Sequence, residues 1–359
     1  MNPFVRRLGI RVPLIQSPMA GVSTPALAAA VSQAGGLGSV AIGHLDRDAA
    51  QAAIAETRRR VNGPFNVNVF CHQPALRDAA KEDAWLERLS PLFGRFGATP
   101  PKQLKEIYQS YLTNRAMQEL LLVESPSVVS FHFGIPSAEH LRELRKRGTC
   151  TLATVTNLDE ALLAQEAGVD ALIAQGFEAG GHRGVFDPDA TDERLSTLNL
   201  TALLSQHIRL PIISAGAIMN AGDVTVALDS GASAVQVGTA FLLCPEVSID
   251  AGYRTAIRQA SSRGTAMTKA VSGRPARSIV NEFTKFGDTL PASISIPSYP
   301  VAYDAGKALR VAAQSAGNHE FGVQWAGEGA AKCESIPAGE VVQHLIEHLP
   351  ISRTYGKTK

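Results

Sequence analysis

Cysteine is scarce in this sequence. The 359 residues include only four cysteines, none of them in a Cys-x-x-Cys pair: Cys71, Cys150, Cys244 and Cys333. Cysteines scattered in this way exclude a disulfide framework and a zinc site built from thiolates. They are typical of proteins kept in a reducing compartment, so the sequence predicts a cytoplasmic protein.

An excess of charge is also missing. The chain has 34 Lys and Arg against 33 Asp and Glu, and aromatic residues make up only 6% of it. Surfaces that bind nucleic acid or anionic membranes need clustered basic side chains. The basic run Arg145–Arg147 is interpreted as the solvated end of a helix. We therefore expect neither nucleic acid nor a membrane as a partner.

Long uninterrupted apolar runs are missing as well. Residues 12–43 carry no charged side chain, but prolines, glycines, Gln16 and Gln33 interrupt them, so no membrane span is expected. Arginines precede the first apolar residues of the chain, as in a signal peptide. Pro13, Gln16 and Pro18 break the apolar core that such a peptide needs. The segment is better explained as a strand, a helix and a second strand, all buried.

The sequence instead alternates short apolar runs with segments of helical pattern or length. The eight runs are PLIQSPM, LGSVAIG, FNVNVF, SVVSFHFG, CTLATV, DALIAQG, PIISAG and SAVQVGTAFL. Runs of this kind between helices predict parallel strands buried on both faces. Eight of them favour an α/β fold of the (β/α)8 TIM barrel type. A Rossmann fold is less favoured, because the first strand is not followed by GxGxxG.

Two long segments depart from this alternation and predict a second, smaller region. Long insertions after barrel strands lie over the carboxyl-terminal face, where they cover an active site. The predicted barrel comprises residues 1–74 and 122–244, with 324–359 returning to it. The predicted substrate-binding subdomain, mainly helical, comprises residues 75–121 and 245–323.

Glycines concentrate in the loops that follow the last barrel strands. AQGFEAGGHRG, residues 174–184, holds four glycines around His182. Glycine permits either a tight turn or a close approach of backbone to a ligand, and both interpretations remain open. The same two interpretations hold for the loops after strands seven and eight, which in barrels often bind phosphate. The candidate phosphate residues are Gly216, Ala217, Gly238 and Thr239.

Polar side chains stand at the ends of several predicted strands. The amides of Asn68 and Gln175 need hydrogen-bond partners, either neighbouring backbone or the edge of a flavin ring. His132 and His182 follow different strands and could converge on one substrate, although a single histidine is more often structural. Glu178 and His182 have the four-residue spacing of metal ligands on a helix, but two glycines between them argue against a helix, so no metal is expected.

A cluster of aromatic residues lies late in the chain. Tyr299, Tyr303 and Lys307 recur at intervals of four, so a helix would place them on one face. Such a face could line a substrate pocket or pack in the core. A Schiff-base role for Lys307 is not expected, because the residue lies outside the barrel strands.

The chain resembles the class I nitronate monooxygenases, formerly called 2-nitropropane dioxygenases, along nearly its whole length. The segments that carry the resemblance are QSPMAGVSTPALAAAVSQAGGLG, NVNVFCH, VVSFHFG, AQGFEAGGHRG, SAGAIMNAGDV, YPVAYDAGKAL and GVQWAGEGA. The glycine-rich segment alone is shared with FMN-dependent enoyl-acyl carrier protein reductases and NADH:quinone reductases. The combination of SFHFG, Gln175, YPVAYDAGKAL and QWAG is more specific. Ser17 is a small departure, because alanine is more usual there.

The resemblance implies an FMN enzyme that oxidises alkyl nitronates, notably propionate 3-nitronate, with O2 through a flavin semiquinone. Its products are a carbonyl compound and nitrite, with nitrate and peroxide also formed. It implies no metal, no NAD(P)H, and a monomer or homodimer. The implied catalytic residues are His182 and His132. Implied substrate contacts are Tyr108, Tyr253, Tyr299, Tyr303 and Lys307. Implied FMN contacts are Met19, Gly21, Asn68, Gln175, Gly180, Gly181, Gly216, Ala217, Gln236, Gly238, Thr239, Gln324 and Trp325.

Two alternatives to this activity remain. One is an NAD(P)H-dependent FMN reductase that acts on a quinone or an enoyl thioester. The other is a barrel that binds phosphate or flavin without catalysis, against which the paired histidines count.

Overall fold

Eight parallel strands form a closed barrel in the computed structural model, which describes residues 2–291 and 293–349. The strand order is β1-β9-β8-β6-β5-β4-β3-β2. The ring closes because the Gln16 N–H donates to the Leu37 carbonyl and the Leu37 N–H donates to the Leu14 carbonyl, both at 2.9 Å. The strands are β1 (Leu14–Gln16), β2 (Gly38–Ala41), β3 (Phe65–Phe70), β4 (Val128–His132), β5 (Cys150–Val155), β6 (Ala171–Gln175), β8 (Ile212–Ala215) and β9 (Ala234–Val237).

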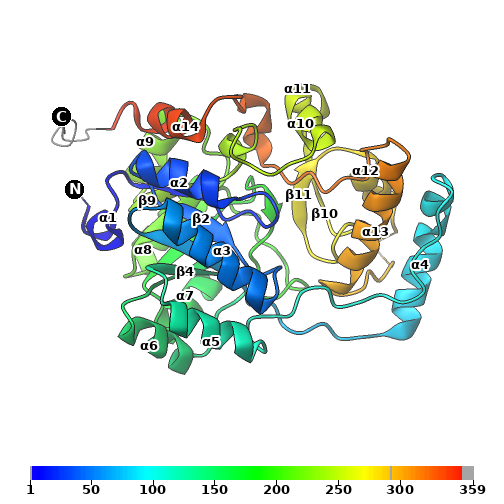
Figure 1. Cartoon of the computed structure of the whole chain (residues 1–359), viewed down its shortest axis with the longest axis horizontal. Helices are drawn as coiled ribbons and strands as arrows, with labels where there is room; N and C mark the ends of the chain where they lie inside the picture. Colours follow the sequence, from blue (N-terminus) through cyan, green and yellow to red (C-terminus); the bar gives the residue numbers. More distant parts are fainter. Residues whose placement is uncertain (1, 292, 350–359) are drawn as a thin grey trace.

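The predicted (β/α)8 barrel is therefore confirmed, and each of the eight apolar runs contains one barrel strand. Helices surround the barrel (Figure 1). Helix α14 packs between α2 and α9. Short α1 places Phe4, Val5 and Leu8 in the core cluster at the amino-terminal end of the strands. These helices are α1 (Pro3–Leu8), α2 (Pro25–Gln33), α3 (Arg47–Arg60), α5 (Arg115–Glu124), α6 (Ala138–Lys146), α7 (Leu158–Ala167), α8 (Thr197–His207), α9 (Ala221–Asp229) and α14 (Ala338–Ile346).

A second region lies beside the barrel, at the right of Figure 1. Its aromatic core includes Trp85 and Phe93 from one helix and Phe283 from another. A three-stranded sheet, which the sequence does not predict, joins this region to the barrel. The elements are α4 (Ala79–Gly94), α10 (Ala251–Arg258), α11 (Ala260–Arg263), α12 (Glu282–Asp288), α13 (Val301–Ser315), β10 (Thr265–Thr268), β11 (Ala276–Ile279) and β7 (Gly181–His182), with η1 (Thr239–Phe241) and η2 (Glu328–Lys332) at its border.

Two details differ from the sequence-based expectation. Helix α5 contributes Met117, Leu120 and Leu121 to the barrel core, so this part of segment 75–121 packs with the barrel and not with the predicted substrate-binding subdomain. Helix α13 begins at Val301, so Tyr299 precedes it. Segment 324–359 is predicted to return to the barrel, and its last residues, 350–359, lie outside the described residues. In the part of the chain that the structure describes, no helix has the length and apolarity needed to cross a membrane.

Candidate active site

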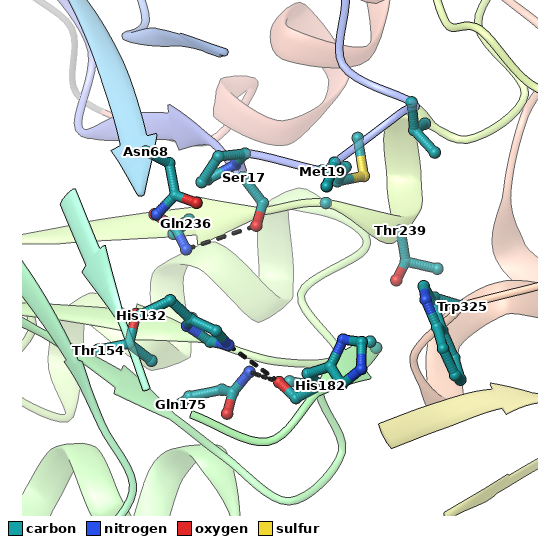
Figure 2. Close-up of a pocket in the computed structure, with 18 of the residues that line it drawn as sticks. Ser17, Met19, Asn68, His132, Thr154, Gln175, His182, Gln236, Thr239 and Trp325 are labelled. Atoms are coloured by element: carbon teal, nitrogen blue, oxygen red, sulfur yellow. Dashed lines mark hydrogen bonds between the residues drawn. The ribbon is translucent and has the colours of Figure 1, made fainter. Parts of the chain in front are cut away.

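One pocket collects most of the predicted site residues at the carboxyl-terminal ends of the barrel strands. The second region forms its other wall, and Figure 2 shows the side chains that face into it. The predicted residues that line it are Met19, Asn68, Tyr108, His132, Gln175, Gly180, Gly181, His182, Gly216, Ala217, Gln236, Gly238, Thr239, Tyr253, Tyr299, Tyr303 and Trp325.

Three predicted site residues do not line this pocket. Gly21 is exposed in the first loop, with φ +74°. The Gln324 amide is used within the fold: it donates to the His319 carbonyl at 3.1 Å and accepts from the Asn281 amide at 3.1 Å. Lys307 lies behind the wall, where its Nζ is 4.7 Å from the centre of the Tyr108 ring. The roles implied for these three residues, like those implied for the residues that line the pocket, stay predictions.

The glycine-rich loop is held in place by the side chain of Gln175. The amide Nε2 donates to the His182 carbonyl at 3.0 Å, and Oε1 accepts from the Gly184 N–H at 2.7 Å. A Cβ at Gly180 would lie 2.4 Å from the backbone nitrogen of Gly327, so glycine is needed there for close backbone packing. Gly181 has φ +76°, which favours glycine. The loop then continues as β7, where His182 pairs with Ala276 of β11.

The two predicted histidines converge on this loop. His132 Nε2 lies 3.2 Å from the His182 carbonyl oxygen, and His182 Nε2 lies 2.9 Å from Ser272 Oγ (Figure 2 shows the first contact). Burial lowers the pKa of His132 to about 4. Burial, followed by the charges of His132 and Arg274, lowers the pKa of His182 to about 3. Both imidazoles are therefore neutral at neutral pH.

Glu178 does not pair with His182. Its carboxylate accepts from the N–H of Thr197 at 2.9 Å and from the Thr197 hydroxyl at 3.0 Å, at the start of α8. Within residues 2–291 and 293–349, no group of three or more His, Cys, Asp and Glu side chains is placed to hold a metal ion. The carboxylate instead links the glycine-rich loop to the amino terminus of a helix, an arrangement favoured by the helix dipole.

Backbone donors gather where the loops after β8 and β9 meet. Gly216 has φ +135°, and Ala217 has φ +53°, which is uncommon for a residue other than glycine. The N–H groups of Ala217, Ile218, Gly238 and Thr239 find no acceptor among the residues that the structure describes. Converging free backbone N–H groups are suited to an anion such as phosphate.

Amide side chains border the same part of the pocket. Asn68 Nδ2 donates to the Ser130 carbonyl at 3.1 Å and to the Ser130 hydroxyl at 3.0 Å. Gln236 Nε2 makes only a long contact with Ser17 Oγ, at 3.5 Å. Gln236 Oε1 is buried and has no partner in the described residues. A buried acceptor of this kind needs a donor, and the edge of a flavin ring carries one.

Aromatic side chains form the opposite wall. The His182 ring centre lies 5.4 Å from that of Tyr299, 5.8 Å from that of Tyr303 and 5.0 Å from that of Trp325. Trp325 Nε1 is 3.4 Å from the Tyr303 hydroxyl, and the Tyr253 hydroxyl donates to the Trp325 carbonyl. Although Tyr299 precedes α13, it remains beside Tyr303, with ring centres 6.3 Å apart.

Sequence reasoning missed several residues of this site. Phe133 lines the pocket, and its φ of +73° points to a special backbone position within SFHFG. Ser272 and Arg274 lie far along the chain, after the barrel strands, and had no local signal. His72 follows the third strand in NVNVFCH, so its position at a strand end was a usable signal.

His72 makes stability depend on pH. It is 1% exposed, and neither of its ring nitrogens has a partner in the described residues. Burial, followed by the charge of Arg274, lowers its pKa from 6.5 to about 4. The unfolded chain binds this proton more tightly than the folded protein does. The contribution of His72 to the free energy of unfolding is therefore complete above about pH 6.5 and is lost as the pH falls towards 4.

We therefore expect His72→Leu to flatten the loss of stability in this pH window. The free energy of unfolding, measured by urea titration between about pH 5 and 7.5, should fall less steeply by up to about 1.4 kcal/mol per pH unit. The exposed His207 supplies the matched control, His207→Leu, which should keep the wild-type slope. An unchanged slope in His72→Leu would show that this histidine is not a buried neutral group.

Comparisons with known proteins agree on one family. The family model of nitronate monooxygenase matches residues 2–348. Nitronate monooxygenase from Paraburkholderia phytofirmans is 54% identical over 342 residues, which are 95% of this chain and 93% of that protein. The protein of the same name from Pseudomonas aeruginosa is 50% identical over 346 residues, 96% of this chain and 98% of that protein.

Solved structures extend the comparison to the fold. A nitroalkane oxidase from Streptomyces ansochromogenes has a TM-score of 0.86 at 36% identity, covering 95% of this chain and 96% of that one. FabK from Thermotoga maritima has a TM-score of 0.73 at 27% identity, covering 97% of this chain and 95% of that one.

Proposed function

Because the chain belongs to the nitronate monooxygenase family, we propose that it binds FMN and oxidises alkyl nitronates with O2. The products would be a carbonyl compound and nitrite, with nitrate and peroxide also formed, and propionate 3-nitronate is the expected substrate. The observation that carries the proposal is the juxtaposition in one pocket of a phosphate-type backbone site, an unpartnered amide oxygen and a cluster of neutral histidines and tyrosines.

The residues present fit FMN. The free N–H groups around Ala217 and Gly238 would hold the phosphate, and the unpartnered Oε1 of Gln236 would accept from the ring. Asn68 and Met19 would border the ring, and the glycine-rich loop would lie against it. When bound, FMN would carry electrons between the nitronate and O2. None of the described residues that line the pocket is a lysine or an arginine, so the orientation of FMN would rest on backbone donors.

The substrate would lie between His182 and the tyrosines. A nitronate is already an anion, so no base is needed to take a proton from carbon. Hydrogen bonds from the tyrosine hydroxyls and from an imidazole N–H would hold the nitro oxygens, and donors to a charged acceptor are stronger than neutral pairs. The aromatic wall of Tyr299, Tyr303 and Trp325 would exclude water from the reacting carbon.

Oxygen uptake tests the proposal. Purified yellow protein should consume O2 when a short alkyl nitronate is added and should not consume it when NADH is added. A second candidate is an NAD(P)H-dependent reductase of a quinone or enoyl thioester, because the glycine-rich segment resembles that of FMN-dependent enoyl-acyl carrier protein reductases. Rapid anaerobic bleaching of the flavin by NAD(P)H would favour this second activity. Flavin binding with neither response would leave a barrel without catalysis.

Lys307 should affect nitronate binding indirectly, through its contacts with Tyr108 and Tyr303. Its Nζ lies 4.7 Å from the Tyr108 ring centre and 5.4 Å from that of Tyr303, and both rings line the pocket. A cation over an aromatic face contributes about 0.5–2 kcal/mol. Lys307→Met should therefore raise the KM for a nitronate by roughly two- to thirtyfold, while FMN stays bound. An unchanged saturation curve would mean that Lys307 only occupies a solvated surface.

A further inference from the structure

Arg274 is a buried cation just behind the pocket. It is 2% exposed and precedes β11. Its guanidinium donates to the Val185 carbonyl and, at 3.1 Å, to the Phe186 carbonyl. Its Nε is sealed from solvent and has no partner in residues 2–291 and 293–349. The centre of the guanidinium lies 4.3 Å from the centre of the Phe133 ring.

No carboxylate in the described part of the chain contacts this charge, and those that stabilise it act from beyond 4.0 Å. Two other arginines are as deeply buried, and each has a partner: Arg183 is 2.8 Å from Asp192, and Arg277 is 3.1 Å from Glu328. Arg274 has no carboxylate oxygen within 4.0 Å in the described part of the chain. Burial lowers its pKa to about 10, so it remains charged at neutral pH. A buried charge with no counter-ion in contact is costly, unless an anion completes the site.

The pocket places such an anion within reach. Phe133 lines the pocket, and its ring centre lies 5.6 Å from that of His182 and 5.3 Å from that of Tyr299. The Ser272 hydroxyl oxygen, which lies 2.9 Å from His182 Nε2, also lies 3.2 Å from the Arg274 carbonyl oxygen. None of the described residues that line the pocket is Lys, Arg, Asp or Glu. The ring of Phe133 therefore contacts both the guanidinium of Arg274 and the pocket.

We propose that Arg274 determines the specificity of this pocket for anions, so that a nitronate binds in preference to the neutral nitroalkane from which it forms. This inference rests on the proposed function only for the identity of the anion. Arg274 lies behind the wall and acts through the field that it creates, so it is a specificity-determining residue and not a catalytic one. The other cation near the pocket is Lys307, which lies against the ring of Tyr108. Lys307 is only half-buried, so solvent screens its charge more than it screens the charge of Arg274.

Binding of nitrate and of neutral nitroethane to the holoenzyme tests this proposal without turnover. Each ligand is titrated while the visible spectrum of the bound flavin is recorded. A unit charge several ångströms away at an effective dielectric constant near 20 changes affinity by about tenfold or more. Arg274→Gln removes the charge but retains a donor for the loop carbonyls, and it should weaken nitrate binding by about tenfold or more, with little change for nitroethane. Arg274→Lys should keep most of the nitrate affinity.

Arg277→Met is the matched control, because it removes a buried arginine that already has a carboxylate partner. It should leave the ratio of nitrate to nitroethane affinity near the wild-type value. Equal weakening of both ligands in Arg274→Gln, or unchanged nitrate binding, would overturn the proposal. If Arg274→Gln does not fold, loss of nitrate binding in folded Arg274→Lys would equally overturn it. Nitrate selectivity in a wild type that does not oxidise nitronates would refute the proposed function alone.

Discussion

Gly238→Val should purify largely without FMN. A Cβ at this position would lie 3.0 Å from the Ser17 Cβ and 3.6 Å from the Met19 sulfur, so the two further methyl groups of valine have to enter the pocket or displace the first loop. The same loop carries the free N–H groups of Gly238 and Thr239. Overpacking costs about 1–3 kcal/mol, which weakens FMN binding by roughly one to two decades.

The ratio of visible to ultraviolet absorbance of the purified protein measures this loss. Gly94→Val is the matched control, because Gly94 is exposed and a Cβ there would meet nothing within 4 Å. The control should stay yellow, and both variants should keep the far-ultraviolet circular dichroism of the wild type. Full FMN occupancy in Gly238→Val would contradict the proposal that this loop contacts FMN and binds its phosphate.

The barrel could be predicted from the sequence because its signals are local. Each strand is a short apolar run buried on both faces, such as β3 and β5, and each is bounded by turn residues. Once eight such runs are recognised, the topology of the barrel brings their carboxyl-terminal ends together. This is why His132 and His182, 50 residues apart, could be expected in one site and lie in contact in the structure.

The rest of the site depends on packing between distant segments, which leaves no periodic pattern. Arg274 approaches Phe133 only because β11 pairs with the glycine-rich loop, and no feature near residue 274 predicts that pairing. The spacing of Tyr299 and Tyr303 predicted a helical face, but α13 begins after Pro300, so Tyr299 reaches the pocket from a loop. Helix α5 also shows this limit, because tertiary packing decides which core its apolar residues join.

The role of His182 depends on which ring nitrogen carries its proton. Ser272 has one hydroxyl proton and two neighbours that can accept it, the Arg274 carbonyl at 3.2 Å and His182 Nε2 at 2.9 Å. If the carbonyl accepts it, Nε2 is protonated and Nδ1 is free to act as a base. If His182 accepts it, Nδ1 carries the proton and can donate to a nitro oxygen. Its low pKa makes the neutral ring the starting point in both cases.

His182→Asn separates these roles. The asparagine amide can still donate a hydrogen bond but cannot act as a base at neutral pH. If His182 positions an anion, the variant should oxidise nitronates with a modest loss, and the wild type should show little activity on neutral nitroalkanes. If His182 is a base, activity on nitroalkanes should fall by about 10²–10⁴-fold and nitronate oxidation should be spared.

We expect the positioning role, because a nitronate needs no deprotonation and because the buried charge of Arg274, with no carboxylate in contact among the described residues, favours an anion that arrives already charged. Oxygen uptake with nitroethane and with its preformed nitronate, measured side by side in the wild type and in His182→Asn, makes the comparison. Ser272→Ala is the informative companion, since it frees His182 Nε2 while leaving the imidazole in place. Robust turnover of nitroethane by the wild type, lost selectively in His182→Asn, would establish His182 as a base instead.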